Sequence, residues 1–228
     1  MALRAPTPLQ VYAPAVGIPS SVWFVIAVVA LLLGAVVLFA DRKGSGRNRD
    51  RRRWADLRDW EFLDTDPVLP SRWRFGTIHQ GGPGVARNLI SGDVPTPDGP
   101  RQAYVFDHEQ AGRLSSVLAA VQLRSALPVA IELRLPSAPE PDAGLDLLDR
   151  VGDRYAFVTD VDAARPLLTP HLATAGDSIG DDVELLWAED TWVLAAAPLD
   201  ATPERVQDLL ADLAEVATAL ELALSALR

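Results

Sequence analysis

The first feature of the chain is an apolar stretch, residues 22–40, that contains no charged side chain. Its nineteen residues would span about 28 Å as a helix, which is close to the hydrocarbon thickness of a bilayer. A cleaved signal peptide is the alternative interpretation. Such a peptide has a basic start, a shorter apolar core and a small-residue cleavage site, whereas only Arg4 precedes this run and Leu38, Phe39 and Ala40 end it. We therefore expect an uncleaved transmembrane helix over residues 22–40.

Beyond residue 60 the apolar positions follow short patterns that are typical of strands. Residues 85–94 and 101–110 flank the sequence PTPDGP, whose prolines and Asp-Gly pair predict a hairpin loop. Residues 128–135 alternate between apolar and polar side chains, which predicts a strand with one face in the core. The same criteria predict strands at 114–123 and 155–161, a loop at 137–146, and a second hairpin formed by 183–187 and 192–198.

The C-terminal residues have the period of a long amphipathic helix. Thr202 is a suitable N-cap, Pro203 suits the first turn, and Glu204 lies near the positive end of the helix dipole. The helix is expected to run to about residue 227. Its apolar stripe consists of Val206, Leu209, Leu210, Leu213, Val216, Ala217, Leu220, Leu224 and Leu227. Shorter helical segments are expected at 51–59 and, limited by two prolines, at 162–175.

Strands grouped in hairpins, with one long helix at the end, indicate the α+β class. The predicted fold is an N-terminal transmembrane helix followed by an antiparallel β-sheet domain with a long C-terminal helix packed on it. The expected parts are a short extracytoplasmic tail (1–21), the transmembrane helix (22–40), a basic juxtamembrane segment (41–59) and a cytoplasmic α+β domain (60–228).

The formal net charge of −10 is unevenly distributed along the 228 residues. Residues 41–59 hold eight basic and four acidic side chains, whereas residues 60–228 hold 12 arginines and 27 acidic side chains. By the positive-inside rule, the basic flank places the C-terminal domain in the cytoplasm and the N-terminus outside the inner (plasma) membrane. The acidic domain argues against a nucleic-acid partner, because neutralising phosphates requires clustered basic residues.

The basic segment is also predicted to contact membrane lipids. A basic residue near an anionic leaflet contributes about 1 kcal/mol. The alternative is that these residues act only as a topology signal. The residues predicted to contact head groups are Arg42, Lys43, Arg47, Arg49, Arg51, Arg52 and Arg53.

The sequence shows no recognisable pattern for catalysis, cofactor binding or metal binding. The chain has no cysteine, which excludes a thiol nucleophile, a disulfide and a zinc-thiolate site. His79, His108 and His171 lie far apart without metal-ligand spacing, so we expect each to lie at the surface or to make a local hydrogen bond, with a metal ligand or general base as the alternative. The glycines of residues 81–84 lack the following Lys and Ser/Thr of a phosphate loop and precede a strand, which predicts a turn. We therefore expect no catalytic residue, no cofactor and no metal.

The acidic residues of the domain suggest solvated turns. Asp181, Asp182 and Glu184 lie close in sequence, but the pattern of a calcium loop is absent. An enzyme is the alternative hypothesis, and it requires distant carboxylates such as Asp107 and Glu184 to meet in one cleft. The other carboxylate pairs expected in turns are Asp64 with Asp66 and Asp160 with Asp162.

Several short stretches of the chain resemble a known family. They are Trp60-Glu61-Phe62 with Asp64, Leu69 and Arg72, then residues 86–92 (ARNLISG), residues 104–107 (YVFD) and Leu127-Pro128. In this order, after an N-terminal span and a basic segment, they resemble the actinobacterial single-pass membrane proteins related to mycobacterial trehalose monomycolate transport factor A. The resemblance implies a cytoplasmic α+β domain on one anchor, without known enzymatic activity, that assists a large lipid transporter of the inner membrane.

Two functional hypotheses follow. The first is a non-enzymatic, single-pass inner-membrane accessory protein that binds an inner-membrane protein complex, such as a large lipid transporter, in lipid export or cell-envelope assembly. The second is a membrane-tethered domain that binds a lipid or small effector in a pocket between the sheet and the terminal helix. The domain's tryptophans are expected to pack in the core, and the alternative is that they line a lipid or partner groove; they are Trp60, Trp73, Trp187 and Trp192.

Overall fold

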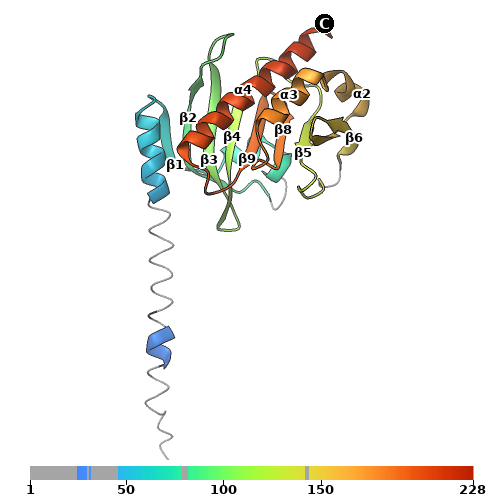
Figure 1. Ribbon diagram of the computed structural model, residues 1–228. Helices are drawn as coiled ribbons and strands as arrows, with labels where there is room; N and C mark the ends of the chain where they lie inside the picture. Colours follow the sequence, from blue (N-terminus) through green and yellow to red (C-terminus); the bar gives the residue numbers. More distant parts are fainter. Residues whose placement is uncertain (1–24, 30, 32–45, 79–81, 142–143, 228) are drawn as a thin grey trace, which may run out of the picture. The chain divides into compact units, whose positions relative to one another are not determined.

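The computed structural model describes residues 25–29, 31, 46–78, 82–141 and 144–227 (Figure 1). The chain divides into two units, Met1–Gly46 and Arg47–Arg228. In the first unit, residues 25–29 are helical and exposed. Within the described ranges, no helix has both the length and the apolar character needed to cross a bilayer. The predicted transmembrane helix at 22–40 lies mostly outside these ranges and stays a prediction.

The second unit is built on an antiparallel sheet, as the sequence predicts. Its order is β1-β2-β3-β4-β9-β8-β5-β7-β6, so the late β8–β9 hairpin joins the early β1–β4 meander to the remaining strands. The described residues contribute nine strands: β1 (Glu61–Asp66), β2 (Val85–Val94), β3 (Arg101–Gln110), β4 (Arg113–Gln122), β5 (Ile131–Arg134), β6 (Asp146–Val151), β7 (Arg154–Val158), β8 (Leu185–Glu189) and β9 (Trp192–Ala197).

Helices cover one face of this sheet (Figure 1). The long helix α4 (Pro203–Ser225) packs beside α3 (Pro170–Ser178) and over β4 and β9. It begins as predicted, because Thr202 Oγ1 accepts a hydrogen bond of 3.2 Å from the amide of Arg205. The two prolines divide the preceding residues into α2 (Val161–Ala164), the 3-10 helix η3 (Arg165–Leu167) and α3.

The opposite face is covered by residues 67–78, which include the 3-10 helices η1 (Leu69–Arg72) and η2 (Gly76–Ile78). Trp73 stacks on Phe106 with ring centroids 6.1 Å apart. Gly76 has a φ of +66° and lies against the Trp187 indole, where a Cβ atom would come within 2.4 Å of the ring. A glycine is therefore required both by the backbone conformation and by the close contact.

The hairpins of the sheet confirm the sequence prediction, but the two edge strands of the sheet were not predicted from the sequence. β2 and β3 coincide with the predicted 85–94 and 101–110. The edge strands β1 and β6 escape a search for apolar alternation, because their sequences EFLDTD and DLLDRV carry charged residues among the apolar ones. β6 also takes the last residue of the expected loop at 137–146.

Candidate functional site

The basic segment folds onto the sheet domain as a helix. Residues 46–56 are helical, rather than the expected 51–59, and we call them the leading helix. Trp54 and Ala55 of this helix join the core cluster that also contains Ile90 and Val94 of β2. The leading helix thus packs on the same face of the sheet as α4, and its basic side chains start from a fixed position.

A buried carboxylate on β3 holds the arginines of the leading helix. Asp107 is fully buried, and its oxygens lie 3.7 Å from Arg47 Nη1 and 3.8 Å from Arg51 Nη2. Asn88 on β2 donates a hydrogen bond of 2.8 Å to Asp107 Oδ2, the oxygen that also faces Arg47, whereas Arg51 faces Oδ1. Arg51 is only 5% exposed, so this ion pair is largely shielded from water.

The backbone of β2 is irregular where it presents Asn88. Asn88 has a φ of 49°, in the left-handed region that asparagine tolerates better than most residues, and the β2–β3 register shifts between Arg87 and Ile90. This bulge lets the Asn88 side chain reach Asp107. The three-residue contact of Asn88, Asp107 and Arg51 joins β2, β3 and the leading helix.

Burial lowers the pKa of the Arg51 guanidinium, and the Asp107 carboxylate acts in the opposite direction. The guanidinium still remains charged at physiological pH, because the ordinary pKa of arginine is far above 7. Asp107 therefore supplies the negative charge that makes burial of this cation tolerable.

A second, exposed contact lies on the neighbouring side of the leading helix. Asn48 Nδ2 donates to Asp64 Oδ1 on β1 at 2.9 Å, and Arg52 Nη2 donates to the same oxygen at 3.3 Å. These two contacts lower the pKa of Asp64, with the Asn48 hydrogen bond the largest cause. The Arg52 guanidinium also lies 4.7 Å from the Phe62 ring centroid. Asn48 and Arg52 of the leading helix thereby contact β1 at Phe62 and Asp64.

The residues predicted to contact lipid head groups thus fall into three sets. Arg47, Arg51 and Arg52 bind carboxylates of the domain, while Arg49 and Arg53 are exposed. Arg42 and Lys43 lie outside the described residues. Head-group contact stays a prediction for the whole segment.

A pocket of about 410 Å³ opens where the leading helix, the end of β2 and α4 meet. We call it the aromatic pocket. Trp54 and Trp60 form one wall in an edge-to-face contact with ring centroids 5.5 Å apart. Its residues are Trp54, Arg58, Trp60, Asp93, Val94, Pro95, Gln207, Leu210 and Ala211.

Polar side chains lie among these apolar walls. The Arg58 guanidinium sits 4.5 Å from the Trp54 ring centroid and donates a hydrogen bond to Gln207 Oε1 on α4. Asp93 at the end of β2 lines the same pocket. Apolar and aromatic walls with a few polar groups are the usual character of small-molecule pockets, and the volume lies in their range of about 300–1,000 Å³.

Sequence reasoning did not identify Trp54, Arg58 or the Asp107 contact, although the leading helix contains a signal for them. Residues 47, 51, 54, 55 and 58 recur at intervals of three and four, so they share one helical face. Two of the buried positions on that face are Trp54 and Ala55. Reading the arginines only as a charge run hid this periodicity.

The remaining candidate residues are dispersed. His108 is buried within β3 and bonds Pro83 O through Nε2 at 3.0 Å, which confirms the expected local hydrogen bond. His171 is exposed, and His79 lies outside the described residues. Asp107 faces the helical side of the sheet, whereas Glu184 lines a pocket on the opposite side. The meeting of carboxylates that the enzyme alternative requires does not occur for this pair.

Metal binding can be assessed for the same part of the chain. No cluster of three or more His, Asp or Glu side chains suited to a metal is found within the residues that the structure describes. Asp181, Asp182 and Glu184 do line one pocket, and Asp182 pairs with Arg205 at 2.9 Å. This pair lowers the pKa of Asp182, with the Arg205 hydrogen bond the largest cause.

The sheet carries helices on one face, and the basic leading helix packs on that same face. The chain therefore belongs to the class of α+β domains, with a basic helix before its sheet. The family model described as trehalose monomycolate transport factor TtfA matches residues 19–220. The chain belongs to this family, which confirms the resemblance seen in the sequence.

A sequence relative and a solved structure are similar to this chain. The chain is 28% identical over 189 residues to trehalose monomycolate transport factor A of Mycolicibacterium smegmatis (strain ATCC 700084 / mc(2)155), a match that covers 81% of this chain and 64% of that protein. The chain therefore matches less than two thirds of the length of this curated relative. The crystal structure of mycobacterial TtfA has a similar fold, with a TM-score of 0.68 at 24% identity, over 78% of this chain and 96% of that chain.

Proposed function

We propose that this chain is a non-enzymatic, single-pass membrane accessory protein that supports export of a trehalose-linked lipid. The observation that carries the proposal is the family match over residues 19–220, which includes the apolar segment, the basic segment and the sheet domain. The curated relative is named as a transport factor for trehalose monomycolate. We extend the same class of cargo to this chain.

The contacts of the leading helix support a role beside a membrane. Asp107 and Asp64 bind arginines of the basic segment, so this segment is joined to the sheet domain rather than acting as a free tether. In this proposal, residues 22–40 anchor the chain and the leading helix holds the domain near the inner leaflet. There the domain contacts a membrane-embedded lipid exporter.

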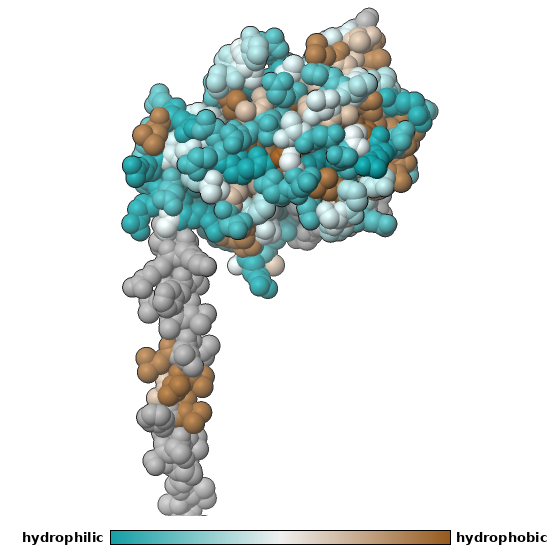
Figure 2. Space-filling model, in the orientation of Figure 1, coloured by the Kyte–Doolittle hydropathy of each residue, from teal (hydrophilic) through white to brown (hydrophobic). Residues whose placement is uncertain are grey.

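The surface of the domain favours a polar contact with that partner. Figure 2 shows the face with α3 and α4 as mostly hydrophilic, with small hydrophobic groups between the polar ones. Residues 60–228 carry 27 acidic side chains against 12 arginines. A partner surface with basic residues would complement this charge and would bind more weakly as the salt concentration rises.

Depletion of the protein in its native host tests the proposal. Trehalose-linked lipids are labelled, the membranes are fractionated, and the lipids are separated by thin-layer chromatography. We expect trehalose monomycolate, or the host's equivalent trehalose lipid, to accumulate in the inner membrane. The full chain should reverse this accumulation, and so should a chain whose residues 22–40 are replaced by an unrelated span, whereas a chain without a span should not. An unchanged lipid distribution after depletion would contradict the proposal.

The partner is tested separately by crosslinking in cells, solubilisation and mass spectrometry. An integral membrane protein should be recovered with the full chain in amounts that fall when the crosslinking is done at high salt. Recovery of soluble proteins alone would contradict an accessory role at the membrane.

The aromatic pocket favours a second candidate function, the binding of a lipid chain where the leading helix, the end of β2 and α4 meet. Trp54, Trp60, Val94 and Leu210 provide apolar walls, and Arg58 provides a cation at the same site. A fatty acid matches both features, because its chain is apolar and its carboxylate is negative. This candidate is compatible with an accessory role, since a transport factor can sense the lipid that it helps to move.

Quenching of tryptophan fluorescence by a brominated fatty acid tests this second function. The full chain carries Trp23→Phe so that its predicted span does not contribute. We expect quenching that falls when Ala211→Phe fills the pocket, because Ala211 lines it. The matched control is Ala226→Phe, an exposed position near the end of the same helix. Equal quenching in the two variants would exclude the pocket as the binding site.

A further inference from the structure

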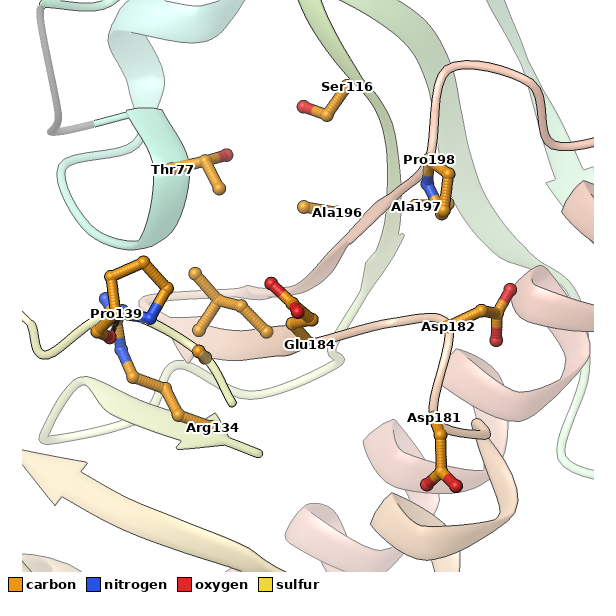
Figure 3. Close-up of a pocket in the computed structure, with 12 residues that line it drawn as sticks. Thr77, Ser116, Arg134, Pro139, Asp181, Asp182, Glu184, Ala196, Ala197 and Pro198 are labelled. Carbon is orange, nitrogen blue, oxygen red and sulfur yellow. Dashed lines mark hydrogen bonds between the residues drawn. The ribbon is translucent and has the colours of Figure 1, made fainter. Parts of the chain in front are cut away.

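A second pocket, of about 460 Å³, lies on the face of the sheet opposite α4 (Figure 3). We call it the hydroxyl pocket. Ser116 of β4 and Ala196 of β9 belong to its floor, Thr77 of η2 and Pro139 form one side, and Glu184 precedes β8 on another. Segments that are far apart in the sequence thus contribute to one site.

Two hydroxyl groups in this pocket lack partners. Thr77 Oγ1 and Ser116 Oγ are both buried, and neither has a hydrogen-bond partner among residues 46–78, 82–141 and 144–227. A buried hydroxyl without a partner is unfavourable, so each of these groups gains from a ligand that donates to it or accepts from it. Both residues are half-buried and line the pocket, so rotation to another staggered χ1 value can turn either hydroxyl toward a ligand.

A carboxylate faces the same space. In Figure 3 the side chains of Glu184, Thr77 and Ser116 surround an open region beside Ala196, whereas the carboxylates of Asp181 and Asp182 point away from it. Glu184 is exposed and has no side-chain ion pair with the described part of the chain. An ionised carboxylate only accepts hydrogen bonds, so this side of the pocket requires a donor.

Arg134, which lines the pocket, already has hydrogen-bond partners within the domain. Arg134 Nε and Nη2 lie 2.7 Å and 2.6 Å from Glu132 Oε2, and its Nη1 donates to Pro139 O at 2.6 Å. Both members of the pair are buried, and Glu132 Oε1 also accepts from the amide of Gly76 at 2.6 Å. Arg134 therefore fixes the wall of the pocket and leaves little positive charge to bind an anion.

Apart from Asp181 and Asp182, the remaining lining is apolar and suits the carbon skeleton of a ligand. Leu185, Ala196, Ala197, Pro139 and Pro198 line the pocket. A ligand with several neutral hydroxyl groups on a compact carbon skeleton satisfies all of these features. Each of its hydroxyls can donate to Glu184 and accept from Ser116 or Thr77, while its C–H groups pack on the apolar residues.

We propose that the hydroxyl pocket binds a neutral sugar ring. This inference rests on the proposed function for the identity of the sugar, which is then the trehalose head group of the lipid cargo. The proposed function and the sugar site make separate predictions. The former concerns the distribution of lipids in cells, and the latter concerns a free disaccharide and the purified chain.

Saturation-transfer NMR with free trehalose tests the site. The full chain is purified in a detergent without a sugar head group, since such a head group would compete. We expect transfer to trehalose protons, with binding weakened about five-fold by Ser116→Ala and again by Thr77→Val, as expected when one hydrogen bond is lost. Glu184→Gln should weaken binding by a similar factor, because the amide accepts hydrogen bonds less strongly than the carboxylate.

The neighbouring serine provides a matched control. Ser115 bonds His108 O at 3.1 Å and alternates with Ser116 along β4, so it faces the other side of the sheet. Ser115→Ala should leave trehalose binding unchanged. Circular dichroism and the thermal midpoint establish that each variant is folded.

Several outcomes would overturn the sugar site. They are the absence of transfer to trehalose, glucose and maltose at millimolar concentration, equal binding by the Ser116→Ala and Ser115→Ala variants, and binding of inorganic phosphate or calcium alone in place of the sugars. Normal trehalose-lipid distribution in depleted cells together with Ser116-dependent trehalose binding would instead refute the proposed function and retain the sugar site. Altered lipid distribution without sugar binding would do the reverse.

Discussion

At the scale of single residues, this domain buries several charged groups and gives most of them defined partners. Asp107 faces two arginines of the leading helix, and Glu189 accepts hydrogen bonds from the amides of Arg74 and Phe75. Burial raises the pKa of Glu189, and these amides act against that shift. Buried charges of this kind fix the position of the segments they bind, because a conformation that leaves the charge buried without its partner has a high free energy.

Substitution of Asp107 should release the leading helix. Asp107→Asn leaves the buried Arg51 without a counter-charge, so we expect a loss of about 3 kcal/mol in the free energy of unfolding. Hydrogen exchange should also become faster over residues 47–56. Asp64→Asn is the matched control, because Asp64 binds Arg52 of the same helix in an exposed contact, where solvent screens the charges. Equal effects of the two substitutions would contradict the assigned role of Asp107.

His108 should make the stability of the domain depend on pH. A carbonyl only accepts, so His108 donates to Pro83 O from Nε2, and its Nδ1 is buried without a hydrogen-bond partner in the described segments. Burial lowers the pKa of His108 below its ordinary value of 6.5. The unfolded chain therefore binds the proton first as the pH falls, and the free energy of unfolding decreases below about pH 6.5.

The pH effect is checked by urea unfolding of the full chain and of His108→Gln between pH 5 and 7.5. We expect the wild-type chain to lose stability relative to the variant on the acid side of this range. Other titrating groups are common to both chains and cancel in the difference. Parallel stability curves would show that His108 does not contribute.

At the scale of elements, the local sequence of α4 determines where the helix begins, and contacts with the sheet determine where the helix lies. Its cap and apolar stripe are visible in the chain, but Arg101 on β3 also holds it through two contacts of 2.8 Å with Glu221. These residues lie 120 positions apart. The helix is therefore fixed near both ends, by Thr202 at its N-terminus and by Glu221 in its last turns.

Two leucines of α4 provide a test of this arrangement. Leu213 is fully buried against the sheet, whereas Leu222 is 57% exposed. Leu213→Ala should lower the free energy of unfolding by about 2–5 kcal/mol, because it removes buried apolar surface and leaves a cavity. Leu222→Ala should change it by no more than about 0.5 kcal/mol. Urea titration monitored by tryptophan fluorescence measures both, and comparable losses would mean that α4 does not bury its stripe as described.

At the scale of the whole molecule, the two pockets lie on opposite faces of one sheet. The aromatic pocket uses α4 and the leading helix, and the hydroxyl pocket uses η2 and residues at the ends of β4, β8 and β9. An apolar chain and a sugar head group are the two chemical parts of a glycolipid. The separate locations imply that substitutions in one pocket leave binding at the other unchanged.

The predicted topology can be tested with introduced cysteines, because the natural chain has none. A cysteine at the exposed Glu140 of the domain should react with a membrane-impermeant maleimide only after the membrane is broken. A cysteine at Thr7, in the predicted outer tail, should react in intact cells. Labelling of the Glu140→Cys chain in intact cells would reverse the proposed orientation and remove the basis for a cytoplasmic partner.

The sequence by itself determined the elements that depend on local chemistry. The β2–β3 hairpin follows from its turn residues, and α4 follows from Thr202, Pro203 and a helical apolar period. Family membership was also readable, because short packing motifs remain recognisable in order along the chain. Such signals lie within a few residues of one another, and a local period or cap is enough to specify them.

Only the tertiary structure decided how these elements meet. The contact of Arg51 with Asp107, the place of β8–β9 beside β4, and the convergence of Thr77, Ser116 and Glu184 each join distant segments. Edge strands carry charged residues because part of their surface faces solvent, so β1 and β6 lacked a clear apolar pattern. The physical reason is common to these cases: pairing and packing across the sheet select partners by three-dimensional fit and charge, which spacing along the chain does not encode.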